Sequence, residues 1–245
     1  MSQASSPHDE RPAGAPSVLV FDVNETLIDI DSLAPQFERI FGDPAVLRTW
    51  FGELVMYSMT LTLSGFYADF FDLGQAVLRM LAEIRGVEPT EEERRGLTEA
   101  MRTMPAHPDA APGLERLLAD GYRLVTLTNS PHRPNSISPL ENAGLSRYFE
   151  QQFTVDGAGV YKPSTHLYRR VASTMGTPVA ECMMVAAHTW DTIGAQGAGM
   201  RGALITRPGN ATLPIAGVPG PHVIAPDIVE FASAMRTFDW TSNAF

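Results

Sequence analysis

The sequence has little cysteine, little positive charge and no long apolar run, and each shortage excludes a class of protein. Its one cysteine, Cys182, excludes a disulfide framework and any zinc site built from cysteines. Eighteen Lys and Arg residues against 28 Asp and Glu give a net charge of −10, whereas nucleic acids and anionic lipids require a basic face. No apolar run reaches the length of a membrane span, and the polar N-terminus lacks the apolar stretch of a secretory signal. We therefore expect a cytoplasmic protein without nucleic-acid or membrane partners.

Two kinds of patterning divide the 245 residues, which predicts one domain that carries an insertion. Residues 1–16 are rich in Ser, Pro, Ala and Gly, which is typical of a disordered leader. Residues 32–105 place apolar side chains three and four positions apart, as amphipathic helices do, with Thr90 as an expected helix N-cap. We expect a helical block at 32–105 and a second unit formed by residues 17–31 and 106–238.

The second unit alternates short apolar runs with helical stretches. Strands are expected at 17–21, 122–127, 152–155, 182–186, 201–205 and 223–224. Helices are expected at 113–120, 135–143, 165–174, 192–198 and 227–238. This alternation predicts right-handed βαβ units and an α/β fold with a doubly wound parallel sheet. In such sheets, ligands bind outside the carboxyl ends of the strands.

Side chains able to do chemistry follow these strand ends. The strand ends and one loop offer Asp22, Thr128 with Asn129, Lys162, and His188 with Asp191. Each has an ordinary interpretation by itself, because a strand-terminal Asp is usually a cap or turn residue and a lone lysine usually lies on the surface. In combination they predict one polar site that contains carboxylates, an amide, an imidazole and an ammonium group.

The same residues form motifs in a known order. Phe-Asp-x-x-x-Thr-Leu at 21–27, Thr-Asn at 128–129, Tyr-Lys-Pro at 161–163 and Trp-Asp at 190–191 resemble the haloacid dehalogenase superfamily, and within it the type II (L-2-haloacid) dehalogenases. The resemblance covers about residues 17–230. It implies a Rossmann-like core with an inserted helical cap domain at 32–105, and it suggests a homodimer.

The resemblance also implies a covalent mechanism. Asp22 is the expected nucleophile: its carboxylate displaces halide from carbon, and water then hydrolyses the aspartyl ester. Lys162 is expected to keep Asp22 ionised, and Asp191 to anchor Lys162 and the hydrolytic water. The substrate-binding roles expected from the family are bracing of the Asp22 turn by Thr26, hydrogen bonds from Thr128 and Asn129, and a pocket wall at Trp190, which is equally typical of a core residue.

Phosphatases of the superfamily use a second Asp two residues after the nucleophile, where this chain has Asn24. An amide cannot protonate a leaving group as a general acid. Where these phosphatases have a pair of acidic residues late in the sequence, this chain has Asp191 preceded by His188. Few oxygen ligands therefore remain for Mg²⁺. We therefore expect chemistry without metal or cofactor.

Three positions depart from the dehalogenase pattern. The cap arginine that receives the departing halide is replaced by Phe51, with Arg48 nearly one turn away. A pocket tyrosine is replaced by Asn24, and a Ser-Ser-Asn run by Ala186-Ala187-His188. The imidazole of His188 suits a base that activates water, and a structural role is the alternative.

These observations predict a hydrolytic dehalogenase of short 2-haloalkanoic acids with a remodelled leaving-group pocket. Phe51, Val55 and Met59 fall on one helix face and would form an apolar pocket roof. Two alternatives stay open: a small-molecule phosphatase, which Asn24 disfavours, and a non-catalytic binding member, which Phe51 favours. The residues do not specify the halogen or the enantiomer.

Overall fold

The structure, a computed structural model, describes residues 11–132 and 137–241, and these contain one parallel six-stranded sheet. The strands run in the order β3-β2-β1-β4-β5-β6. They are β1 (Val18–Phe21), β2 (Arg123–Thr128), β3 (Gln151–Thr154), β4 (Cys182–Ala186), β5 (Arg201–Ile205) and β6 (Val223–Ala225). Each expected strand is present within one residue at either end, and the predicted α/β fold is confirmed. β1 lies between β2 and β4, and all four of its residues are buried. Its carboxyl end therefore lies near the middle of the sheet.

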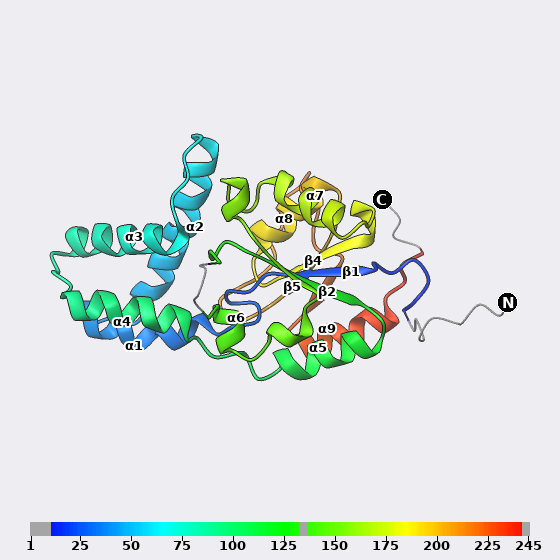
Figure 1. Ribbon diagram of the computed structural model, residues 1–245, viewed down its shortest axis with the longest axis horizontal. Coiled ribbons are helices and arrows are strands. Elements are labelled where there is room, and N and C mark those ends of the chain that lie inside the picture. The colour runs from blue at the N-terminus through cyan, green and yellow to red at the C-terminus, as the bar shows by residue number, and fades with distance from the viewer. Residues whose placement is uncertain (1–10, 133–136, 242–245) are drawn as a thin grey trace.

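Helices cover both faces of the sheet (Figure 1). α5 (Ala110–Ala119) and α9 (Ile228–Thr237) pack together on one face, and α7 (Thr165–Thr174) and α8 (Thr189–Ala198) on the other. A glycine makes the first contact possible, because a Cβ at Gly113 would lie 2.5 Å from the Ile228 side chain. The polar residues after β1, β2 and β4 emerge at the end of the sheet that faces the inserted helices.

The chain between β1 and β2 forms the helical block at one end of the molecule (Figure 1). Its elements are η1 (Ile30–Leu33), α1 (Ala34–Phe41), α2 (Val46–Leu63), α3 (Phe70–Arg85) and α4 (Glu91–Arg102). Trp50 is buried between α2 and α3, where its Nε1 donates to the carbonyl of Gly74 at 2.9 Å. Thr90 caps α4 with a capping box completed by Glu93, as its sequence predicts. The exact boundaries of a cap domain stay a prediction.

One expected helix is shorter than its sequence pattern. α6 (Pro139–Asn142) replaces a helix predicted at 135–143, of which residues 135 and 136 lie outside the described residues. Ser138 explains the late start, because its side chain accepts from the N–H of Glu141 and a proline follows it at the first helical position. The remaining short helices are η2 (Ser146–Tyr148), η3 (Asp156–Ala158) and η4 (Val179–Glu181).

The N-terminal segment is described from residue 11 onward. Residues 1–10 of the predicted leader lie outside the described residues, whereas Gly14 accepts a hydrogen bond from Arg201 at 2.7 Å. Among the residues described, no helix is both long and apolar enough to cross a bilayer.

Candidate active site

A buried ammonium group joins two carboxylates at the carboxyl end of the sheet. Lys162 Nζ lies 2.7 Å from Asp22 Oδ1 and 2.6 Å from Asp191 Oδ2, and its third hydrogen bond goes to the carbonyl of Leu127 at 3.0 Å. All three charged side chains are buried. Lys162 is also the only lysine among the 245 residues. Three of the predicted site residues thus form a single ion-paired cluster.

Neighbouring elements hold each member of this cluster in place. Asp22 is the residue directly after β1. Thr26 Oγ1 donates to Asp22 Oδ2 at 2.7 Å and accepts from the N–H of Ala187 at 2.8 Å. The Tyr168 hydroxyl on α7 donates to Asp191 Oδ1 at 2.5 Å. Gly194 lets α8 approach the lysine loop, because a Cβ there would lie 2.4 Å from Pro163 Cβ. Thr26 therefore joins the Asp22 carboxylate to the backbone that follows β4.

The cluster keeps Asp22 ionised in spite of its burial. Burial raises the pKa of Asp22, but the charge of Lys162 and the contact with His188 outweigh it and hold that pKa well below its usual value. For Lys162, burial lowers the pKa, and the charges of Asp191 and Asp22 more than compensate, so its pKa lies above the usual value. A carboxylate and an ammonium group are therefore the stable forms at neutral pH.

His188 lies between Asp22 and a second carboxylate, Glu25. Its Nε2 is 2.7 Å from Glu25 Oε2, and its Nδ1 is 3.5 Å from Asp22 Oδ2, too long for a good hydrogen bond. Nδ1 is buried and has no hydrogen-bond partner among the residues that the structure describes. Burial lowers the pKa of His188, but its contacts with both carboxylates outweigh burial and raise the pKa to about 9. The ring is therefore an imidazolium at neutral pH.

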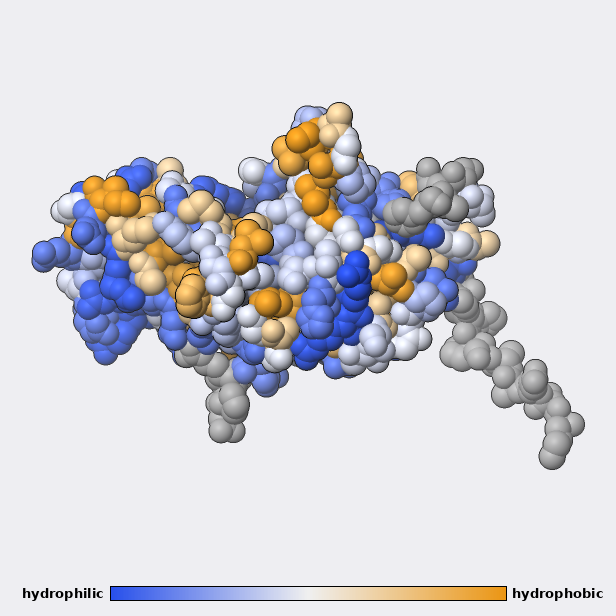
Figure 2. All heavy atoms as spheres, turned by 90° about the horizontal axis from the view of Figure 1, so that it is seen from above, coloured by the Kyte–Doolittle hydropathy of each residue, from blue (hydrophilic) through white to orange (hydrophobic). Residues whose placement is uncertain are grey.

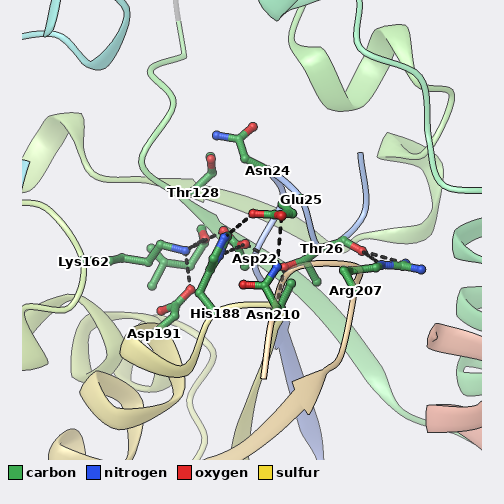
Figure 3. Close-up of polar contacts among 12 residues, drawn as sticks. Asp22, Asn24, Glu25, Thr26, Thr128, Lys162, His188, Asp191, Arg207 and Asn210 are labelled. Carbon is green, nitrogen blue, oxygen red and sulfur yellow. Dashed lines mark hydrogen bonds and ion pairs between the residues drawn. The ribbon is translucent and has the colours of Figure 1, made fainter. Parts of the chain in front are cut away.

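Glu25 is a residue of this site that the sequence interpretation missed. Its backbone has φ of +67°, a conformation that disfavours side chains other than those of Gly, Asn and Asp. The carboxylate is buried, and it accepts hydrogen bonds from Asn210 Nδ2 at 3.0 Å and from His188 Nε2 (Figure 3). It also forms an ion pair with Arg48 on α2. The site therefore pairs three carboxylates, Asp22, Glu25 and Asp191, with three cations, Lys162, His188 and Arg48.

Arg48 forms ion pairs with two carboxylates. Its guanidinium pairs with Glu25 and with Asp31, whose Oδ1 lies 2.8 Å away. These two contacts attach the cap helix α2 to the chain that follows β1. Arg207, from the loop after β5, braces the same region: it forms two hydrogen bonds with Asp109 and donates to the carbonyl of Thr26 at 2.8 Å.

Three further predicted residues, Asn129, Thr128 and Asn24, lie around the cluster in different environments. Asn129 lies beside the cluster, and its Oδ1 accepts from the N–H of Lys162 at 3.1 Å. Thr128 instead accepts from the N–H of Ser130, and it lines a separate small cavity. Asn24 Nδ2 donates to Ser130 Oγ at 3.0 Å, whereas its Oδ1 is buried without a partner among the described residues.

Two cavities meet at His188. The inner one, about 10 Å³, is lined by Asp22, Asn24, Phe51, Val55, Phe70, Asn129, Lys162, His188 and Trp190. The outer one, about 610 Å³, reaches Glu25, Arg48 and Asn210. His188, Phe51, Val55 and Trp190 line both cavities, and the centroid of the His188 ring lies 5.5 Å from that of Phe51 and 5.1 Å from that of Trp190. Both aromatic side chains therefore line the space beside Asp22.

The inner cavity contains an apolar roof and a charged floor. Phe51 and Val55 of α2 lie above the cluster, as their spacing predicts, and Phe70 of α3 adds to them. Among the described residues, no group of three or more His, Cys, Asp and Glu side chains has an arrangement that could hold a metal ion. The arrangement can present an ionised carboxylate to an uncharged carbon atom beneath an apolar roof.

The signals for the missed residues lie in the sequence. Glu25 stands inside the motif between Asp22 and Thr26, at a position treated as variable. Arg207 and Asn210 follow the strand at 201–205. Because ligands bind outside the carboxyl ends of parallel strands, their position alone marks them as candidates. Their partners lie far away in the chain, and only the folded structure identifies them.

Comparison with known proteins agrees with this architecture. A family model described as haloacid dehalogenase-like hydrolase matches residues 16–199. An (S)-2-haloacid dehalogenase of Xanthobacter autotrophicus is 30% identical over 191 residues, which cover 77% of this chain and 74% of that enzyme. The solved structure of L-2-haloacid dehalogenase from Xanthobacter autotrophicus has a TM-score of 0.80 at 25% identity, with 91% of this chain and 100% of that chain covered. A phosphatase of Mycobacterium tuberculosis is 25% identical over 197 residues, 79% of this chain and 88% of that protein.

Proposed function

The chain belongs to the haloacid dehalogenase-like hydrolase family, and on that premise we propose that it hydrolyses the carbon–halogen bond of short 2-haloalkanoic acids through an ester on Asp22. The observation that carries this proposal is the buried ion pair between Asp22 and Lys162. A carboxylate is a weak nucleophile in water because water solvates it strongly. Here fixed donors replace that water, so the attacking group needs no solvent reorganisation.

The proposed reaction has two displacement steps. In the first, an oxygen of Asp22 attacks the carbon that bears the halogen, and the halide leaves with the bonding electrons. In the second, water attacks the carbonyl carbon of the ester, and the hydroxy acid leaves while the Asp22 carboxylate is restored. Attack at carbon inverts the configuration, and hydrolysis at the carbonyl does not change it again.

Each neighbour of Asp22 has a role in these steps. Lys162 and Thr26 orient the carboxylate, and Asp191 holds the ammonium group of Lys162 in place. Asn129 and Asn24, which line the same cavity, supply polar atoms for the substrate. His188 faces Asp22 through Nδ1 and is the group best placed to contact the hydrolytic water.

The substrate must displace the cap side chains when it binds. A cavity of about 10 Å³ holds about one water molecule, so no haloacid fits above Asp22 in this closed arrangement. Phe51 and Val55 of α2 form the roof, and the Arg48 contacts fix the base of that helix. We propose that α2 moves away from His188 and Trp190 during entry and returns before the chemistry, which then proceeds without bulk water.

We also propose that the reaction needs no metal ion. Lys162 Nζ occupies the place between Asp22 and Asp191 in which a cation would bridge two carboxylates. Asn24 cannot act as the general acid on which a phosphatase mechanism depends. The similarity to a mycobacterial phosphatase makes phosphate-ester hydrolysis the second candidate, and Asn24 is the residue that disfavours it.

One screen separates the candidate functions. Halide release is measured with chloro-, bromo- and fluoroacetate and with both enantiomers of 2-chloropropionate, in buffer that contains EDTA. Phosphate release from small phosphate esters is measured in parallel with Mg²⁺. We expect halide release with EDTA and no phosphate release. Phosphate release alone would establish the second candidate, and neither activity would favour a binding role.

A further inference from the structure

His188 connects the nucleophile to a second carboxylate that the family motifs leave unassigned. Its Nδ1 points toward Asp22 and has no hydrogen-bond partner among the described residues, while its Nε2 contacts Glu25 at 2.7 Å (Figure 3). A buried polar atom without a partner is rare in folded proteins, so Nδ1 is available to a molecule that lies beside Asp22. In the second step of the proposed reaction that molecule is the hydrolytic water.

We infer that Glu25 is a positioning residue that orients His188 as a base and that this base becomes active only after Asp22 has been esterified. The inference rests on the proposed function, because it concerns the second step of that reaction. Glu25 accepts the hydrogen bond of Nε2–H and so leaves the lone pair of neutral His188 on Nδ1, which faces the ester.

The charges around His188 explain why the base is inactive before the first step. Asp22 lies on one side and Glu25 on the other, and both favour the protonated ring. The other charged groups nearby are Lys162 and Asp191, which pair with each other and with Asp22, and Arg48, which pairs with Glu25. With Asp22 ionised, the pKa of His188 is about 9, so the ring keeps its proton and stabilises the carboxylate.

Esterification removes one of the two negative charges. The ester of Asp22 is neutral, so the attraction that held the proton on Nδ1 is lost and the pKa of His188 falls. The imidazolium then gives its Nδ1 proton to solvent water, and the halide has already departed. A water molecule attacks the ester carbonyl while Nδ1 takes one of its protons, and the second proton of that water passes to the departing alkoxide. The products are the hydroxy acid, the Asp22 carboxylate and the imidazolium, so atoms and charges balance over the cycle.

The partners of Glu25 hold it in the orientation that this role needs. Glu25, Arg48 and Asn210 line the outer cavity of about 610 Å³. Arg48 and Asn210 hold the Glu25 carboxylate so that its Oε2 stays directed at the ring.

Glu25→Gln tests the inference, because it removes the charge and keeps the shape of the side chain. Enzyme in excess is mixed with L-2-chloropropionate, the reaction is quenched, and halide and intact protein mass are followed in time. We expect one equivalent of halide at an almost unchanged rate, followed by hydrolysis of the ester slowed about 100-fold or more. The ester on Asp22 then accumulates, whereas a merely structural role for Glu25 would slow both steps or neither.

Asp31→Asn is the matched control. Asp31 is the other carboxylate that pairs with Arg48, and the contacts among the described residues do not join it to His188. Its loss removes the second ion pair that attaches α2 and leaves the contacts of the imidazole intact. We expect this variant to release halide and hydrolyse the ester at nearly wild-type rates.

The outcomes separate this inference from the proposed function. A wild-type protein that releases no halide from any 2-haloacid overturns both. A wild-type protein that turns over while Glu25→Gln hydrolyses its ester at the wild-type rate overturns the inference alone. Accumulation of ester in Asp31→Asn would also contradict it, because the effect would then come from the cap helix.

A second measurement does not depend on how well Glu25→Gln folds. The pKa of His188 is measured by NMR in the wild-type protein and in Asp22→Asn, whose neutral side chain stands in for the ester. We expect a lower pKa in Asp22→Asn than in the wild type. An unchanged or higher pKa would show that the charge of Asp22 does not control the base, and the inference would fail.

Discussion

Lys162 Nζ lies 2.7 Å from Asp22 Oδ1, and both side chains are buried. A nucleophilic carboxylate must be ionised and also shielded from the water that would solvate it. The buried ion pair with Lys162 meets both requirements. Asp191 and Tyr168 continue the network behind the lysine and fix its position.

The single lysine allows a direct measurement of this pair. In protein labelled with ¹⁵N at lysine Nζ, we expect one ammonium resonance that stays protonated above the usual pKa of 10.5, because Asp191 and Asp22 raise the pKa of Lys162 against burial. Asp191→Asn removes one of the two charges and should lower that pKa. A resonance that titrates below 10.5 in the wild type would contradict the ion-paired arrangement.

Lys162→Met should abolish most activity and destabilise the fold. Its removal leaves Asp22 and Asp191 buried together without their cation, a situation that costs about 3–5 kcal/mol of unfolding free energy. We expect kcat/KM for halide release to fall at least about 100-fold, since a preorganised charge at the reacting group is lost. Urea unfolding and halide assays at pH 7 measure both effects. Unchanged stability would mean that the carboxylates are not held together as described.

Gly194→Ala should reduce activity through the lysine loop. The new methyl group would lie 2.4 Å from Pro163 Cβ and 2.9 Å from the Tyr168 hydroxyl, so the loop that carries Lys162 must shift. Gly197→Ala is the matched control in the same helix, because its methyl group would meet only Thr165 at an ordinary 3.6 Å. We expect a loss of both melting temperature and kcat for Gly194→Ala only. Equal effects of the two substitutions would point to helix propensity instead of contact.

The charge of His188 predicts how stability depends on pH. Its pKa is about 9 in the folded protein and near 6.5 in the unfolded chain, so its contribution to stability is complete below pH 6.5. The contribution is lost as the pH rises through 9, and His188→Asn should flatten that decline. Melting temperatures from pH 6 to 10 measure the slope, with the exposed His166→Asn as control. A His188→Asn variant that declines like the wild type would argue against the charged ring.

Much of this arrangement follows from local sequence patterns, and the remainder depends on contacts between distant residues. Strands such as 182–186 are buried on both faces and appear as apolar runs, and the strand-end rule identifies Asp22 and Asp191. The role of Glu25 depends on His188, which is 163 residues away, and on Asn210, 185 residues away. Arg48 is a further example. The helical pattern around it does not identify the carboxylates with which it pairs.

The central claim, a covalent ester on Asp22, is tested most directly by the fate of the oxygen atoms. Excess enzyme is allowed one turnover of L-2-chloropropionate in H₂¹⁸O, and both the product and the peptide that contains Asp22 are analysed by mass spectrometry. We predict that ¹⁸O enters the Asp22 carboxyl group and that the hydroxy acid carries an unlabelled oxygen from the protein. Label in the hydroxy acid, with none in the Asp22 peptide, would show that water attacks the carbon directly and would contradict the covalent mechanism.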